Sequence, residues 1–166
     1  MNHTETFKDI ISALNKYEVE YLVVGGAAVG YYGYHRQSMA RGGQLVDEPD
    51  LDIWFNPTPK NYVQMIKALE ELKIDVSRLK DEQIVDPKKS FLRYTLDDCT
   101  LDLLPQIKAP IRFRDAYTRK SDFNRNGFEM TVIGVEDLIT DKEASSRPKD
   151  LVDIAHLRAI YLPDSQ

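Results

Sequence analysis

Residues 50–54, Asp-Leu-Asp-Ile-Trp, alternate carboxylates with apolar side chains. On a β-strand, residues two apart point to the same face, so Asp50 and Asp52 project together while Leu51 and Ile53 enter the core. Two adjacent carboxylates raise each other's pKa unless a cation neutralises them. Mg²⁺ prefers oxygen ligands and is often held by one or two carboxylates plus substrate phosphates. The stretch therefore predicts a strand that carries a candidate site for Mg²⁺ or Mn²⁺.

Apolar patterns on both sides of this stretch predict more strands, interspersed with helices. Together they indicate an α/β (α+β) protein with a mixed β-sheet flanked by helices. At 166 residues we expect a single domain, with a core over about 18–134 and C-terminal helices over about 135–160. The predicted strands are 21–24, 51–55, 91–95, 99–104 and 128–133, with Asp97-Asp98 as a hairpin turn signal between two of them.

Two further features have spacing that favours phosphate chemistry. Asp102 interrupts an apolar strand, and if that strand neighbours the first, three carboxylates could hold two metals roughly 4 Å apart. Gly25-Gly26 follow a strand and open a helix, where a bare backbone can approach a phosphate closely. Each feature also has an ordinary explanation. Asp102 could be an edge residue that faces water, and Gly25-Gly26 could form a simple tight turn. The glycines match neither a Walker sequence nor a GxGxxG fingerprint.

Composition narrows the function classes. The net charge of −5 argues against a protein that coats nucleic acid through a basic surface. The single cysteine, Cys99, excludes an intramolecular disulfide and indicates a small core residue. No run of eighteen apolar residues and no signal-peptide pattern is present, so we expect a cytoplasmic protein without membrane partners.

The order of these motifs resembles the minimal DNA polymerase β-like nucleotidyltransferases, and most closely the group that contains the AbiEii-type toxins. The resemblance runs from about Tyr21 to Leu157. The segments that carry it are GGAAVGYYGYHR, DLDIW, LDLL and DLITDKEASSRPKDLVDIAHL.

The resemblance implies an enzyme that transfers an NMP group from an NTP to a hydroxyl acceptor, with pyrophosphate leaving. Asp50, Asp52 and Asp102 match the metal-binding carboxylates, and Asp102 can also serve as the base for the acceptor hydroxyl. Lys142 matches a catalytic lysine that approaches the nucleotide phosphates. The remaining matches imply a nucleotide-binding set: Gly25, Gly26, Arg36, Ser38, Arg147, Lys149 and Asp150.

One departure and one alternative qualify these assignments. In the family, this arginine lies only a few residues before the first Asp, whereas Arg36 lies fourteen positions before Asp50. Residues 39–49 therefore look like an inserted loop, which could cover the nucleotide or displace Arg36 from the site. Asp47 and Glu48 in that loop are expected to be solvated. Asp150, Asp153 and His156 recur every three residues, a spacing that usually marks a solvated helix face.

The acceptor stays open between RNA such as a tRNA end, a protein hydroxyl and a small molecule. Residues 106–125 hold six basic and two acidic residues, a local charge of +4, with Phe113, Tyr117 and Phe123 interleaved. Such a pattern suits RNA, but it also fits a solvated amphipathic helix with a buried aromatic stripe. A rival interpretation is a non-catalytic nucleotide-binding protein, or an antitoxin or interaction module with a cognate partner protein.

Overall fold

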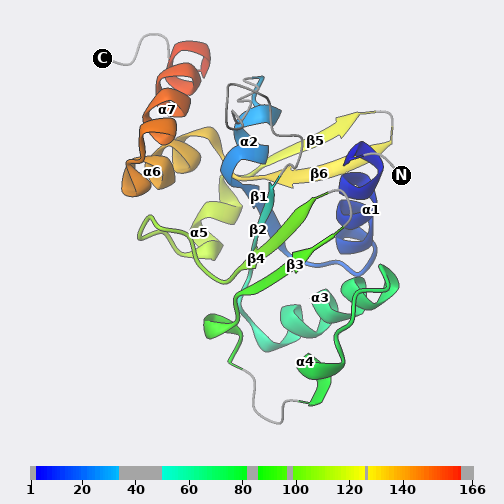
Figure 1. Cartoon of the computed structure of the whole chain (residues 1–166). Coiled ribbons are helices and arrows are strands. Elements are labelled where there is room, and N and C mark those ends of the chain that lie inside the picture. The colour runs from blue at the N-terminus through cyan, green and yellow to red at the C-terminus, as the bar shows by residue number, and fades with distance from the viewer. Residues whose placement is uncertain (1–2, 34–49, 82–85, 97–98, 126, 162–166) are drawn as a thin grey trace, which may run out of the picture.

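The computed structural model describes residues 3–33, 50–81, 86–96, 99–125 and 127–161, and its centre is a mixed six-stranded sheet (Figure 1). The strand order is β3-β4-β2-β1-β6-β5. Pairs β2/β4 and β1/β6 are parallel, whereas β1/β2, β3/β4 and β5/β6 are antiparallel. The strands are β1 (Tyr21–Val24), β2 (Asp50–Phe55), β3 (Leu92–Thr95), β4 (Thr100–Leu104), β5 (Ser121–Arg125) and β6 (Phe128–Val132). The predicted fold class is confirmed.

The helices cover the sheet. Helices α6 and α7 pack against each other and lie together on one side of the molecule (Figure 1). None of the helices that the structure describes is long and apolar enough to span a bilayer. The helices are α1 (His3–Lys16), α2 (Gly25–Tyr31), α3 (Pro59–Glu71), α4 (Ser77–Asp81), α5 (Phe113–Thr118), α6 (Val135–Ser145) and α7 (Pro148–Tyr161), with a short 3-10 turn at Pro87–Lys89.

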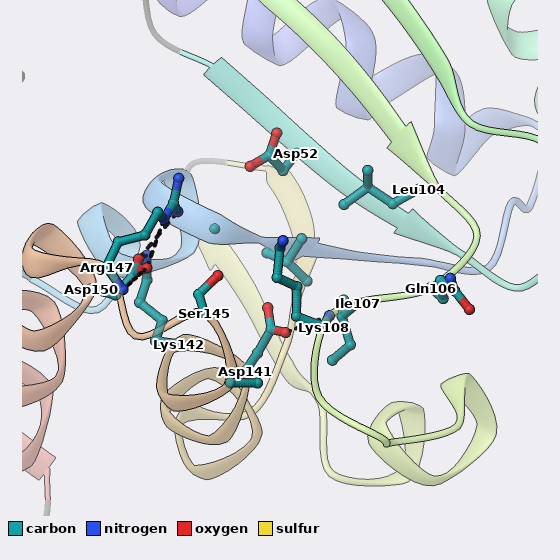
Figure 2. A pocket seen from close by; sticks show the side chains of 13 residues that line it. Asp52, Leu104, Gln106, Ile107, Lys108, Asp141, Lys142, Ser145, Arg147 and Asp150 are labelled. Carbon is teal, nitrogen blue, oxygen red and sulfur yellow. Dashed lines mark hydrogen bonds and ion pairs between the residues drawn. The ribbon is translucent and has the colours of Figure 1, made fainter.

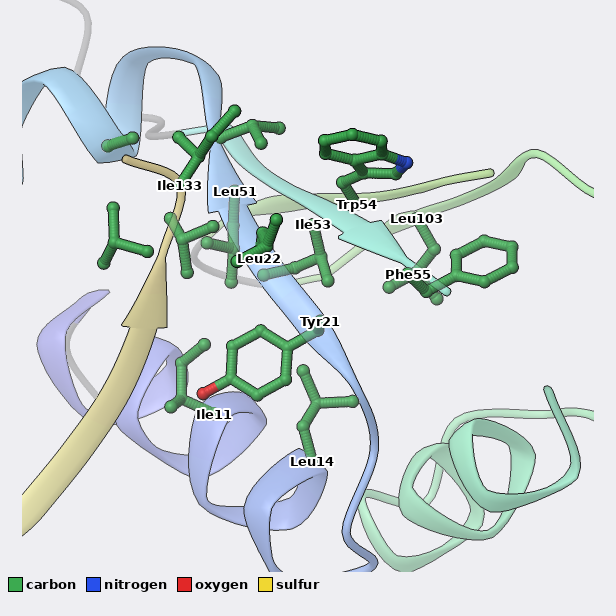
Figure 3. Packing of buried hydrophobic residues seen from close by; sticks show 14 of the residues in the cluster. Ile11, Leu14, Tyr21, Leu22, Leu51, Ile53, Trp54, Phe55, Leu103 and Ile133 are labelled. Atoms are coloured by element: carbon green, nitrogen blue, oxygen red, sulfur yellow. The ribbon is translucent and has the colours of Figure 1, made fainter. Parts of the chain in front are cut away.

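The two faces of β2 bury different side chains, as the alternation of residues 50–54 predicts. Leu51 and Ile53 are buried on the face that packs on α1 and α3, where the Phe55 ring lies 6.3 Å from the Tyr62 ring. Figure 3 shows this core, with α1 supplying Ile11 and Leu14 beneath Tyr21. Trp54 points to the opposite face, 5.2 Å from the ring of Phe113 on α5. Asp52 shares the face of Trp54, so it lies on the side of the sheet that α5 and α6 cover.

The basic stretch 106–125 differs from the amphipathic helix considered above. It forms only the short helix α5, and its end pairs with β6 as strand β5. Phe113 is buried against Trp54, and Phe123 packs on Tyr31. Of the aromatic side chains considered for base stacking, Phe113 is therefore in the core, while Tyr117 and Phe123 are partly buried against it.

Candidate functional site

The parallel pairing of β2 and β4 places two of the predicted carboxylates next to each other. Asp52 stands opposite Asp102 in the ladder, and Asp50 stands opposite Thr100. Because neighbouring residues in register point to the same face, Asp50, Asp52 and Asp102 share one side of the sheet. Asp102 is 8% exposed, and Asp50 at the start of β2 is exposed. Carboxylates from two strands that are 50 positions apart in the sequence thus lie side by side.

Burial and neighbouring negative charge both act on the carboxyl group of Asp52. Its pKa is raised to about 6, first by burial and then by the charges of Asp102 and Asp50. The cations of Lys142 and Arg93 lower the pKa but do not cancel this effect. A buried carboxylate with a raised pKa beside other carboxylates is a candidate functional group.

Gly25 packs directly against this carboxylate. Its φ of +66° lies in the left-handed region that glycine adopts without strain. A Cβ atom at this position would overlap Oδ2 of Asp52 and lie 3.3 Å from its Cγ. The glycine at the start of α2 is therefore required by the close approach of the β1–α2 turn to Asp52.

Asp102 has a partner that sequence reasoning missed. Arg93 on β3 stands opposite Asp102 and binds both carboxylate oxygens, with Nε 2.7 Å from Oδ1 and Nη2 3.0 Å from Oδ2. The sequence already contained the information for this pairing, because a two-residue hairpin turn at 97–98 places position 93 opposite position 102. Residues 97 and 98 themselves lie outside the described residues, but the N–H of Leu96 donates to the carbonyl of Cys99 at 2.8 Å.

A buried ion cluster joins α6 to α7. Nζ of Lys142 lies 3.2 Å from Oδ1 of Asp150 and 3.1 Å from Oδ2 of Asp153, and all three residues are buried. Arg147 adds a second cation, with Nε 2.8 Å from Oδ2 of Asp150. Burial alone would raise the pKa of Asp150, but hydrogen bonds from Arg147 and Lys142 outweigh it and lower the pKa to about 2.

This cluster corrects one interpretation of the α7 sequence. The solvated-face interpretation is wrong for Asp150 and Asp153, which point inward, while His156 lies on the exposed side of the helix. Periodicity alone cannot detect such a cluster, because the buried cation that satisfies both carboxylates comes from another helix.

A cavity of about 620 Å³ separates Asp52 from the α6–α7 pair. Its volume is in the range of small-molecule sites. Figure 2 shows Lys108 reaching into it from the segment after β4, and Arg147 and Lys142 on the α6–α7 side. Asp141 on α6 fixes that segment by accepting hydrogen bonds from the backbone N–H groups of Lys108 at 2.8 Å and Ala109 at 3.0 Å.

Comparison of this architecture with solved structures identifies the fold. The lincosamide antibiotic adenylyltransferase LnuA, solved with lincomycin bound, aligns with a TM-score of 0.56 at 16% identity, over 96% of this chain and 98% of the other. The chain has the nucleotidyltransferase fold. The antibiotic-resistance factor ANT(2'')-Ia aligns with a TM-score of 0.54 at 17% identity, over 96% and 85% of the two chains.

A third structure with the nucleotidyltransferase fold, from Thermotoga maritima and provisionally assigned to these enzymes, has a TM-score of 0.53. It is 16% identical over 99% of this chain and 97% of its own. The sequence itself matches no protein-family model and no curated protein sequence. The likeness therefore rests on the arrangement of the strands and helices, and the AbiEii-type assignment stays a prediction.

Within this nucleotidyltransferase fold, the cavity gathers part of the predicted site. It is lined by five of the predicted residues: Gly25, Asp52, Lys142, Arg147 and Asp150. Asp102 lies beside Asp52 on the next strand, whereas Gly26 and the exposed Lys149 are not among the lining residues. Arg36, Ser38 and the loop 39–49 lie outside the described residues. Sequence reasoning gave no role to Lys108, Asp141 or Ser145, which also line the cavity.

The three carboxylates are chemically suited to bind a hard divalent cation. Asp50, Asp52 and Asp102 supply only carboxylate oxygens, the ligands that Mg²⁺ and Mn²⁺ prefer, and Asp52 and Asp102 stand side by side on one face of the sheet. Among the described residues, no three carboxylate, His or Cys side chains are already grouped as metal ligands. Both oxygens of Asp102 accept hydrogen bonds from Arg93 instead.

Proposed function

We propose that the protein is a metal-dependent nucleotidyltransferase that moves an NMP group from an NTP to a hydroxyl acceptor. The observation that carries this proposal is the placement of Asp52 beside Asp102, with the Gly25 turn packed on Asp52 at the wall of a ligand-sized cavity. The carboxylates, the close backbone and the cavity cations are the parts that phosphoryl-transfer chemistry requires, because that chemistry depends on positioning and charge stabilisation.

The reaction exchanges one bond at the α-phosphorus for another. The acceptor oxygen bonds to the α-phosphorus, the bond to the β-phosphate oxygen breaks, pyrophosphate leaves, and a carboxylate takes the acceptor proton. Asp50 and Asp52, with Asp102, would hold Mg²⁺ or Mn²⁺, which neutralises charge on the phosphate oxygens when bound. Asp102 is the candidate base. Asp52 must be ionised to act as a ligand, so its raised pKa favours activity above about pH 6.

The cations of the cavity supply the triphosphate contacts in this proposal. Arg147 keeps 55% of its side chain exposed although it holds Asp150, so its remaining N–H groups can donate to phosphate oxygens. Lys108 faces the same space and forms no ion pair among the described residues. Gly25 and Gly26 would bring backbone close to the phosphates, and Lys149, Arg36 and Ser38 keep the nucleotide-binding roles that the resemblance implies.

Lys142 has a distinct role in this account. Its Nζ is enclosed by Asp150 and Asp153, yet its charge lowers the pKa of Asp52. We infer that Lys142, which lines the cavity, favours the ionised form of Asp52 through its charge. It also helps to position Arg147, because both cations bind Asp150. Direct contact between Lys142 and a phosphate stays a prediction.

We propose a small hydroxylated molecule as the acceptor. LnuA, which covers nearly the same length, is an antibiotic adenylyltransferase, and ANT(2'')-Ia is an antibiotic-resistance factor. The packing of Phe113 inside the fold weakens the case for RNA, since it removes one stacking surface from the basic stretch. A toxin-like role on RNA, and a protein acceptor, remain the competing proposals.

The test incubates the protein with Mg²⁺ and each α-³²P-labelled NTP, in parallel with lincosamides, aminoglycosides, total RNA and total cell protein. We expect label on a small molecule with the wild-type protein and none with the Asp52→Asn variant. Label on RNA would keep nucleotidyl transfer and replace the acceptor. Absence of label from every acceptor, in the presence of either Mg²⁺ or Mn²⁺, would contradict the proposed activity.

A further inference from the structure

Arg93 neutralises Asp102 in the place where the proposed function requires a metal ion. The guanidinium forms two hydrogen bonds, at 2.7 and 3.0 Å, so both carboxylate oxygens are engaged. An arginine fork therefore serves as the counter-cation of this part of the site in the metal-free protein.

The side chains of Asp102 and Arg93 differ greatly in their exposure to solvent. The Asp102 side chain is 12% exposed and lies on β4, which is paired on both sides, with β3 and with β2. The Arg93 side chain is 61% exposed and comes from the edge strand β3. Its guanidinium lies 5.5 Å from the ring centre of Phe91, itself an exposed residue. Arg93 is thus the more exposed partner, and it can return to water when another cation takes its place at Asp102.

We propose that Arg93 is a built-in competitor of the divalent cation at Asp102. This inference rests on the proposed function, because it assumes that Asp102 belongs to the metal site. A divalent cation and a guanidinium at one carboxylate repel each other, so binding of the metal must displace Arg93 or tolerate its charge. Arg93 therefore lowers the affinity of the free protein for metal.

The structure contains a matched control for this idea. Arg119 binds Asp137 with the same two-pronged geometry, Nε to Oδ2 at 2.9 Å and Nη2 to Oδ1 at 3.2 Å. The exposed fractions are also similar, 50% for the Arg119 side chain and 10% for Asp137. Neither residue lines the cavity. Arg119→Gln thus removes an equivalent ion pair without changing the candidate metal site.

The experiment measures Mn²⁺ binding to the nucleotide-free protein by the loss of the free-Mn²⁺ electron paramagnetic resonance signal. We expect Arg93→Gln to bind Mn²⁺ about tenfold more tightly than the wild type, Arg93→Lys to lie between them, and Arg119→Gln to match the wild type. In an Asp102→Asn background, Arg93→Gln should bring no gain. Circular dichroism at the same temperature verifies that each variant is folded.

The possible outcomes separate the two proposals. If the wild type binds Mn²⁺ and Arg93→Gln binds it equally or more weakly, the competitor role of Arg93 is wrong and the metal site stands. If the gain persists in the Asp102→Asn background, Arg93 acts elsewhere and the inference fails. If neither wild type nor Arg93→Gln binds Mn²⁺ at millimolar concentration, the metal site and this inference fall together.

Discussion

Gly25 and Asp52 approach each other so closely that position 25 has no room for a side chain beside the carboxylate. The contact joins the β1–α2 turn to the end of the antiparallel β1/β2 pair, where Asp52 stands opposite Val24, the last residue of β1. It therefore fixes where the Asp52 carboxylate points, and with it the geometry of any metal bound there.

Gly25→Ala should remove activity at a moderate cost in stability. The new Cβ displaces Asp52, and the positive φ adds strain of about 1 kcal/mol or more. Gly127 has a φ of +79° with open space around it, so Gly127→Ala reports the backbone strain alone. Urea unfolding and NMP transfer are measured on both variants. Full activity in Gly25→Ala would show that the position of Asp52 does not matter.

Asp52→Asn should stabilise the metal-free protein at neutral pH. The pKa of Asp52 is about 6 in the folded state and near 3.8 when unfolded, so the folded state binds the proton more tightly. Stability that depends on this group is therefore present at low pH and falls as the pH rises from about 4 to 6. Above this window we expect the Asp52→Asn variant to have a free energy of unfolding about 1–2 kcal/mol higher than the wild type, after allowing for the partial exposure of the side chain.

The measurement is chemical unfolding in EDTA at pH 4 and pH 7.5. The gain of Asp52→Asn should be present at pH 7.5 and nearly absent at pH 4. An equal gain at both pH values would show that the variant acts through packing rather than through the charge of Asp52.

Lys142→Met should strongly destabilise the α6–α7 pair. Removing the ammonium leaves two buried carboxylates without their shared cation, and breaking such a cluster typically costs about 3–5 kcal/mol. Lys149→Met changes an exposed lysine seven positions later and should stay within about 0.5 kcal/mol of the wild type. Thermal unfolding compares the two, and similar melting temperatures would contradict a structural role for Lys142.

Lys108→Gln should weaken nucleotide binding without changing the chemical step. The variant keeps the backbone N–H groups that Asp141 fixes and removes only the cation from the cavity. We expect the KM for NTP to rise about three- to tenfold with kcat little changed. Lys120, which pairs with Asp122 away from the cavity, gives the control Lys120→Gln. A fall in kcat with constant KM would instead place Lys108 at the reacting centre.

The sheet and the carboxylates were predictable because their signals are local. The alternation at residues 50–54 sets the faces of β2, and the predicted hairpin sets the register of β3 on β4. The strand β5 was missed because its sequence, Ser-Asp-Phe-Asn-Arg, has few apolar residues and is held at the sheet edge by pairing with β6.

The charge clusters were beyond prediction from patterns alone. The burial of Asp150 and Asp153 depends on a lysine from α6, and the role of Asp141 depends on the backbone of a segment more than thirty residues earlier. Such pairings follow from tertiary packing, which periodicity does not encode. Arg93 is the exception, since the hairpin register already placed it beside Asp102.

The proposed reaction transfers the α-phosphoryl group of an NTP, together with its nucleoside, to a hydroxyl acceptor. The most direct measurement incubates the protein with Mg²⁺, a whole-cell extract as the source of acceptors, and the same NTP labelled at either the α- or the γ-phosphate. We expect α-label to become attached to an acceptor and γ-label to be released as pyrophosphate, and we expect Asp52→Asn to show neither. Transfer of γ-label to the acceptor, or release of orthophosphate alone, would contradict it.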